Sequence, residues 1–228
     1  MLNPWFGRYK RGISLKQTEV AGAPAYLLSP GAVKESAVVI HGYGGNKEEV
    51  VGLGMAVAGA GYRVYLPDLP GHGMHPRQLA ENVVRDFVAA LKTYGFKAAV
   101  GHSLGGRVAM VLGVKPLCLL SLPLAARFEG RKSDLLRVLR ARRVRESKPF
   151  GGLAEVLAAL TDPWPDPPVL LFYAFQDLPT CLEAAAKGRQ GGWETRAVKT
   201  AGHLDIVSAP EVLTAVKSYL EKERAVCR

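Results

Sequence analysis

Gly101-His102-Ser103-Leu104-Gly105 decides the fold of this chain, because it places a serine in a sharp turn between two regular elements. The preceding residues, 96–100, are short and apolar and predict a buried strand, and residues 105–113 predict a helix. Small residues at 101 and 105 leave room for a turn that forces the serine into strained backbone geometry. The pattern predicts a serine hydroxyl at a helix N-terminus, where unpaired N–H groups and the helix dipole favour a developing anion.

The composition is that of a soluble globular protein. The 228 residues are 48% hydrophobic, which is enough to bury a sizeable core. No apolar run approaches the roughly 20 residues needed to span a bilayer, and no apolar segment of signal-peptide length follows the basic N-terminus. We therefore expect a cytoplasmic protein without a transmembrane segment.

The cysteines indicate neither a disulfide framework nor a metal site. They are three in number and widely spaced, at Cys118, Cys181 and Cys227. Cys118 lies in an apolar run and is expected in the core, and Cys227 lies in the C-terminal tail as a free thiol.

The net charge of +10 is unevenly distributed. Residues 127–148 contain nine Lys and Arg against three acidic residues. Such a segment can attract an anionic partner such as nucleic acid or a membrane surface, or it can form a solvated helical face. We favour the solvated face, so nucleic acid is not an expected partner.

Apolar strands alternate with helical segments along most of the chain. This alternation predicts a parallel sheet covered on both faces, after an edge hairpin at residues 13–28. It stops between residues 124 and 166, which predict a small helical lid insertion and not a second domain. The expected strands are 36–40, 62–66, 96–100, 117–122, 169–175 and 194–199, and the expected helices are 47–60, 76–94, 105–113, 179–187 and 210–223.

Polar residues lie just past the ends of several predicted strands. They are His41, Asp68, Ser103, Asp177 and His203. In open α/β sheets, ligands bind beyond the carboxyl ends of the strands. This convergence predicts a catalytic site at that edge.

A serine hydroxyl needs a base within hydrogen-bond reach, and the base needs an acid to fix its tautomer. Of the five histidines, His203 lies between the last strand and the last helix, where a loop can reach Ser103. We assign His203 as the base and Asp177, which follows the preceding strand, as the acid. Asp205 is the alternative acid, and Glu129 is a remote one.

Two backbone N–H groups are expected to bind the oxyanion. One belongs to Leu104, directly after the serine, and the other to Tyr43, in a glycine-bracketed turn after the first parallel strand. Asp68 precedes Gly71-His72-Gly73 and has no evident chemical step, so we interpret it as part of a structural turn.

These motifs resemble the α/β-hydrolase fold family. The matching residues are His41-Gly42-Tyr43-Gly44-Gly45, Asp68 to Gly73, Gly101 to Gly106, Asp177 and Gly202-His203, in the chain order serine, acid, histidine. The resemblance covers residues 13–225 apart from the insertion, although Gln176 stands where the family often has a glycine before its acid. It implies a single domain over residues 1–228, a mostly parallel eight-stranded sheet, an acyl-serine intermediate and no cofactor.

The function expected from these residues is a serine hydrolase acting on small-molecule carboxylic esters or thioesters. A modest insertion with an apolar face favours short to medium acyl chains. Other triad chemistry is an alternative, as an amidase or a cofactor-free haloperoxidase, and so is a non-catalytic binding module that uses the basic insertion. The apolar face comprises Leu135, Leu136, Val138, Leu139, Leu153, Val156 and Leu157.

Overall fold

The computed structural model describes residues 12–31, 33–124, 141–146, 152–160 and 164–226. Most of the basic segment 127–148 and part of the expected lid insertion 124–166 therefore lie outside the described residues, as do Glu129 and Cys227. Within the described ranges, no helix is both long enough and apolar enough to cross a membrane.

The described strands form one eight-stranded sheet in the order β1-β2-β4-β3-β5-β6-β7-β8. The β1–β2 hairpin and the β2–β4 pair are antiparallel, and the remaining pairs are parallel. The predicted edge hairpin and mostly parallel sheet are thus confirmed. The strands are β1 (Ser14–Val20), β2 (Ala23–Ser29), β3 (Ser36–Ile40), β4 (Arg63–Pro67), β5 (Ala98–His102), β6 (Leu117–Leu120), β7 (Val169–Ala174) and β8 (Glu194–Val198).

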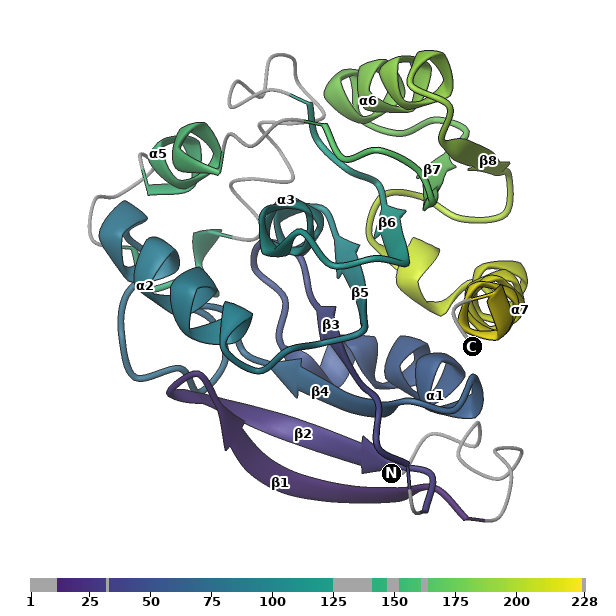
Figure 1. The fold of residues 1–228 in the computed structure, drawn as a ribbon. Helices are drawn as coiled ribbons and strands as arrows, with labels where there is room; N and C mark the ends of the chain where they lie inside the picture. Colours follow the sequence, from purple (N-terminus) through teal and green to yellow (C-terminus); the bar gives the residue numbers. More distant parts are fainter. Residues whose placement is uncertain (1–11, 32, 125–140, 147–151, 161–163, 227–228) are drawn as a thin grey trace.

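Helices cover both faces of this sheet (Figure 1). One apolar core contains side chains from α1 and α7, and a second contains side chains from α2, α3, α5 and α6. The central strands are buried on both faces, which explains their near-continuous apolar sequences. The helices are η2 (Lys47–Val50), α1 (Val51–Gly59), α2 (Glu81–Lys92), α3 (Leu104–Leu112), α5 (Gly152–Ala159), α6 (Pro179–Gln190), η3 (Asp205–Ser208) and α7 (Pro210–Val226).

Helix α2 begins at Glu81, five residues after the predicted start at 76. The residues before it are engaged elsewhere: the Gly71 N–H donates to the Arg77 carbonyl, and the Leu79 N–H donates to the Arg145 carbonyl. The second bond comes from a segment far away in sequence, so local helical periodicity could not reveal it.

The side chain of Arg107, on α3, donates hydrogen bonds to the C-terminal end of α5. The Arg107 guanidinium donates hydrogen bonds to the carbonyls of Leu124, Leu157 and Leu160, at 3.2, 3.3 and 2.5 Å. The last two acceptors lie at the C-terminal end of α5, where helix carbonyls lack intrahelical partners.

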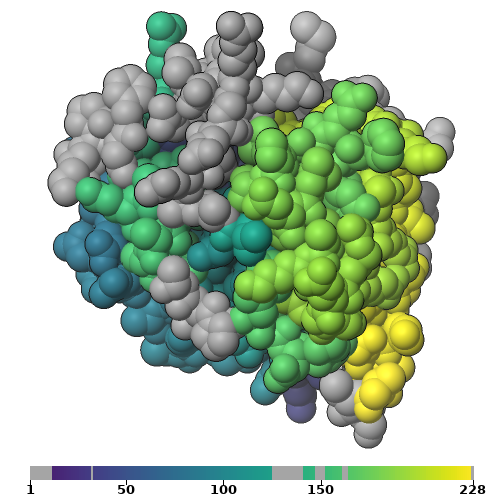
Figure 2. Space-filling view, turned by 90° about the horizontal axis from the view of Figure 1, so that it is seen from above, coloured from purple at the N-terminus to yellow at the C-terminus, as the bar shows by residue number. Residues whose placement is uncertain are grey.

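From above, α2 (blue) and α6 (light green) lie on opposite sides of the molecule (Figure 2).

Candidate active site

The turn between β5 and α3 has the strained geometry predicted for Ser103. Its φ and ψ are 50° and −115°, a region that residues with a side chain rarely occupy. Glycine is required on both sides, because a Cβ at Gly101 would lie 2.3 Å from the Gly105 carbonyl oxygen and one at Gly105 would lie 2.4 Å from that of His41. The turn places Ser103 at the N-terminus of α3.

Three of the predicted side chains meet at the carboxyl end of the sheet. Ser103 Oγ lies 3.2 Å from Nε2 of His203, and Nδ1 of the same ring lies 2.7 Å from Oδ1 of Asp177. Asp177 follows β7 and His203 follows β8, so neighbouring parallel strands bring both residues to one edge. The contacts give a continuous hydrogen-bonded path from carboxylate to hydroxyl.

Asp177 is held as an anion by its surroundings. Its oxygens accept hydrogen bonds from Ser121 Oγ (2.5 Å), the Ala174 N–H (2.9 Å) and the Leu178 N–H (2.8 Å), besides the bond from His203. Burial disfavours the charge, but these donors outweigh it and lower the pKa of Asp177 to about 2. The carboxylate therefore stays ionised at neutral pH and accepts a hydrogen bond from the Nδ1–H group of His203.

The sequence reasoning missed Ser121, which has a φ of 47° and is fully buried. It follows β6 directly, so it belongs to the same pattern of polar residues after strand ends. That position was the one signal that could have revealed it.

Two hydrogen bonds stabilise the loop that carries His203. The His102 ring approaches the His203 backbone carbonyl, with Nε2 2.8 Å from the oxygen. Asp205 accepts the Gly202 N–H at 2.7 Å, within the loop itself. Asp205 thus stabilises the loop, and Asp177 is the carboxylate that contacts the imidazole.

The turn after β3 packs directly on the serine turn. A Cβ at Gly42 would lie 2.6 Å from Nδ1 of His102 and 3.3 Å from Cβ of Ser103. The next residue is Tyr43, the predicted second oxyanion donor. Leu104 is the first residue of α3, where an N–H has no acceptor within the helix. Both residues thus belong to turns that border Ser103, and their role as donors stays a prediction.

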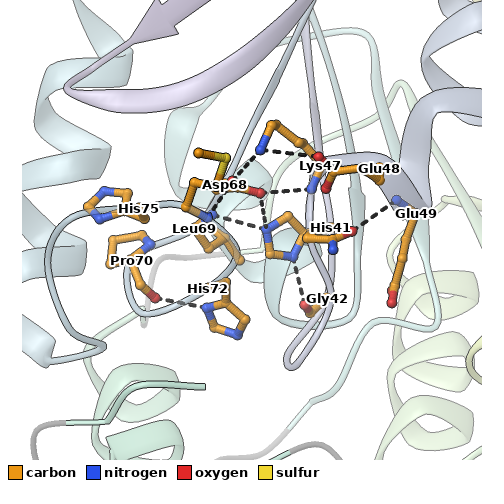
Figure 3. A network of polar contacts seen from close by, with 12 residues as sticks. His41, Gly42, Lys47, Glu48, Glu49, Asp68, Leu69, Pro70, His72 and His75 are labelled. Atoms are coloured by element: carbon orange, nitrogen blue, oxygen red, sulfur yellow. Dashed lines mark hydrogen bonds and ion pairs between the residues drawn. The ribbon is translucent and has the colours of Figure 1, made fainter. Parts of the chain in front are cut away.

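His41 and Asp68 lie in a separate buried network (Figure 3). Asp68 accepts from Lys47 Nζ at 2.7 Å and from the N–H groups of Lys47 and Met74 at 2.9 Å each. His41 Nε2 accepts the Leu69 N–H at 3.0 Å. The acid here is neutralised by a cation and bound to backbone, which fits the structural turn inferred from the sequence.

Cys181 was not foreseen near the site. Its thiol lies 3.9 Å from Nδ1 of His203 and 3.2 Å from the Ser121 carbonyl oxygen. Asp177, Cys181 and His203 form the one group of three potential metal ligands in the part of the chain that the structure describes. Burial raises the pKa of the Cys181 thiol well above its usual value, which disfavours the thiolate that binds metals. We therefore assign no metal to this group.

Comparisons with known proteins agree with this fold. Residues 38–115 match the sequence model of the α/β-hydrolase fold family. Together with the sheet order and the serine turn, this match shows that the chain has the α/β-hydrolase fold.

Two curated relatives are lipid- or ester-cleaving enzymes by name. A thermostable monoacylglycerol lipase from Bacillus sp. (strain H-257) is 31% identical over 101 residues, 41% of this chain and 40% of the relative. A carboxylesterase from Bacillus subtilis (strain 168) is 31% identical over 100 residues, 37% of this chain and 41% of the relative. The matched parts thus span about two fifths of either relative's length.

Solved structures extend the likeness over almost the whole chain. A hyperthermophilic esterase from the archaeon Pyrobaculum calidifontis has a TM-score of 0.63 at 18% identity and covers 92% of this chain and 86% of its own. A hormone-sensitive lipase from a metagenome library has a TM-score of 0.64 at 16% identity and covers 93% and 85%. At these identities the likeness shows the shared fold.

Proposed function

We propose that the protein is a serine hydrolase that cleaves carboxylic esters or thioesters of short to medium acyl chains. One observation carries the proposal: the imidazole of His203 bridges the Ser103 hydroxyl and the ionised Asp177 carboxylate, at 3.2 and 2.7 Å. A serine is a weak nucleophile unless a base stands within this distance. The names of the two bacterial relatives support ester cleavage as the reaction.

In the proposed first half-reaction, Ser103 Oγ attacks the carbonyl carbon while His203 Nε2 takes its proton. The negative oxygen of the tetrahedral intermediate is bound by the backbone N–H groups of Leu104 and Tyr43. Asp177 stabilises the resulting imidazolium. His203 then gives the proton to the leaving alcohol or thiol, and the acyl group remains on the serine.

In the second half-reaction, His203 Nε2 takes a proton from water, and the hydroxide oxygen attacks the acyl carbon. The second tetrahedral intermediate collapses to release the carboxylic acid, and the proton returns to Ser103. Each step uses only water and the chain's own side chains and backbone groups, so the proposed reaction requires no cofactor. The sequence-based expectations of one domain and a cytoplasmic location belong to this proposal.

The preference for short to medium acyl chains rests on the small size of the predicted insertion, residues 124–166. Leu153, Val156 and Leu157 of α5 are buried in the core shared with α2 and α3, while residues 135–139 of the predicted apolar face lie outside the described residues. Para-nitrophenyl esters of graded length, with an acyl-CoA thioester and an anilide, test this preference. The anilide also detects amidase activity.

The central test is the Ser103→Ala variant, assayed with a fluorophosphonate label and with these esters. We expect loss of labelling and a fall in kcat of about 10⁴- to 10⁶-fold, as when a triad member is removed. Ser14→Ala in the exposed hairpin is the matched control and should retain both signals. Ester turnover by Ser103→Ala at the wild-type rate would refute the mechanism, and a wild-type protein that neither labels nor turns over substrate would favour a non-catalytic binding role.

A further inference from the structure

The Tyr43 side chain makes a contact that the proposed reaction leaves unexplained. Its phenol donates a short hydrogen bond to Oε1 of Glu146, 103 residues further along the chain. The His72 ring packs edge-on against the phenol, with ring centroids 5.7 Å apart. The side chain of the predicted oxyanion residue is therefore fixed by two distant parts of the sequence.

Glu146 is held by backbone contacts of the described residues 141–146. The Arg145 N–H donates to the Gly71 carbonyl at 2.9 Å, and the Arg145 carbonyl accepts the Leu79 N–H at 2.7 Å. Glu146 itself forms a parallel bridge with Leu79. Because backbone bonds fix this segment, the Glu146 carboxylate has a defined position and can position other groups in turn.

The placement of this carboxylate is costly. Oε2 of Glu146 is buried and accepts no hydrogen bond from any residue that the structure describes. A buried acceptor without a partner destabilises the folded state, whereas an apolar side chain of similar size would avoid that cost. Within the described residues, the hydrogen bond from Tyr43 is the interaction of the Glu146 side chain that an apolar side chain at this position could not make.

The glycine-rich turn that contains Tyr43 restrains its own backbone only weakly, so a contact from outside the turn can fix it. Gly42, Gly44 and Gly45 surround the tyrosine, and Gly44 has a φ of 67°. Glycines give the backbone more conformational freedom than other residues do. An oxyanion donor stabilises the transition state only if it is held in place before the reaction.

We propose that Glu146 is a positioning residue for the oxyanion turn: by holding the Tyr43 phenol, it fixes the peptide N–H of Tyr43 beside Ser103. This inference rests on the proposed hydrolase function. Glu146 touches neither the substrate nor the reacting atoms, and it acts entirely through Tyr43. Its contribution therefore belongs to kcat more than to substrate binding.

The test is ester hydrolysis by the full chain carrying Glu146→Ala, Glu146→Gln or Tyr43→Phe. We expect Glu146→Ala and Tyr43→Phe each to lower kcat about 10- to 100-fold, with KM changed less than about threefold, because a donor is displaced and not removed. Glu146→Gln keeps an oxygen that accepts from the phenol and should recover most of the wild-type kcat. The double variant Tyr43→Phe/Glu146→Ala should fall no further than either single variant.

The matched control is Arg143→Ala, which removes an exposed 3.2 Å ion pair between the same segment and Glu49. It should leave kcat and KM unchanged, and urea unfolding of each variant checks that the fold is intact. The inference is overturned if Glu146→Ala keeps the wild-type kcat, if Glu146→Gln is as slow as Glu146→Ala, or if Arg143→Ala is equally slow. A wild-type protein without Ser103-dependent turnover would refute the proposed function, and this inference with it.

Discussion

Two Asp–His pairs lie at the carboxyl end of the same sheet, and their surroundings differ. Asp177 and His203 approach to 2.7 Å, and the His203 side chain is 10% exposed. Asp68 and His41 are 4.0 Å apart, and their side chains are 0% and 1% exposed. Sequence position alone makes the two pairs look equivalent, because all four residues follow strands.

The difference lies in what else each pair contacts. His203 has its second ring nitrogen on the Ser103 hydroxyl, so a proton can pass between them. Both nitrogens of His41 are occupied by backbone, with Nδ1 2.8 Å from the Gly42 carbonyl oxygen and Nε2 accepting from Leu69. A third group that can exchange a proton, and not the Asp–His pair itself, therefore marks a site capable of catalysis.

The largest expected effect separates the two acids. Asp177→Asn should lower kcat for ester hydrolysis about 10⁴-fold while the protein stays folded, because the neutral amide stabilises the wrong tautomer of His203. Asp68→Asn should instead lower the free energy of unfolding and leave kcat of the folded protein within about tenfold of wild type. It removes the buried carboxylate partner of Lys47 and leaves that ammonium paired with the exposed Glu48 alone, at 3.3 Å. Steady-state kinetics and urea unfolding of both variants measure this. Equal kcat losses would show that the two pairs are not functionally distinct.

The next effect concerns the buried ion pair between Lys47 and Asp68, 2.7 Å apart with the Lys47 side chain 4% exposed. Lys47→Met should destabilise the fold by about 3–5 kcal/mol, because it leaves a buried carboxylate unpaired. Adding Asp68→Asn removes that charge and keeps an oxygen that can accept from one of the two backbone N–H groups, those of Lys47 and Met74. Urea unfolding of the double variant should show recovery of part of the loss, and a purely additive result would argue against pairing as the cause.

The same network predicts how stability responds to acid. Burial, with His41 nearby, lowers the pKa of His72 to about 3, and burial also lowers the pKa of His41. Below the usual histidine pKa of about 6.5, the unfolded chain binds protons that the folded protein excludes, so stability falls as pH drops from about 6.5 towards 3. Each excluded proton contributes about 1.4 kcal/mol per pH unit. Urea unfolding between pH 7 and 4.5 should show this slope, and His72→Asn should reduce it.

The smallest effect concerns backbone strain at Ser103, which has a positive φ. Ser103→Gly should stabilise the fold by about 1 kcal/mol relative to Ser103→Ala, because glycine adopts this conformation without steric cost. Thermal unfolding of the two inactive variants measures the difference. A glycine variant that melts no higher than the alanine variant would mean that the turn is not strained.

Local sequence predicted the parts of the fold and site that depend on strand order. Ser103, Asp177 and His203 could be placed together because each follows a predicted strand, and parallel strands end at one edge. The hairpin and the strand at 36–40 could also be predicted, because each is recognisable from a short local pattern of apolar and turn-forming residues. The role of these residues as a triad remains a prediction.

Contacts between distant segments could not be predicted in this way. The support of Asp177 by Ser121, the pairing of Lys47 with Asp68 and the bond from Tyr43 to Glu146 each join residues 21 or more positions apart. The start of α2 was placed too early because residue 145 holds the backbone before it. Such contacts depend on three-dimensional packing, which one sequence does not display.

The hydrogen bonds of Arg107 have a consequence for how this chain can change over evolutionary time. One guanidinium fastens residue 124, soon after the chain leaves the sheet, and the end of α5, shortly before the chain returns to it. Exit and return are thus anchored to the helix that begins at the serine turn. Insertions and deletions between these two anchor points can therefore be accommodated without moving the serine turn.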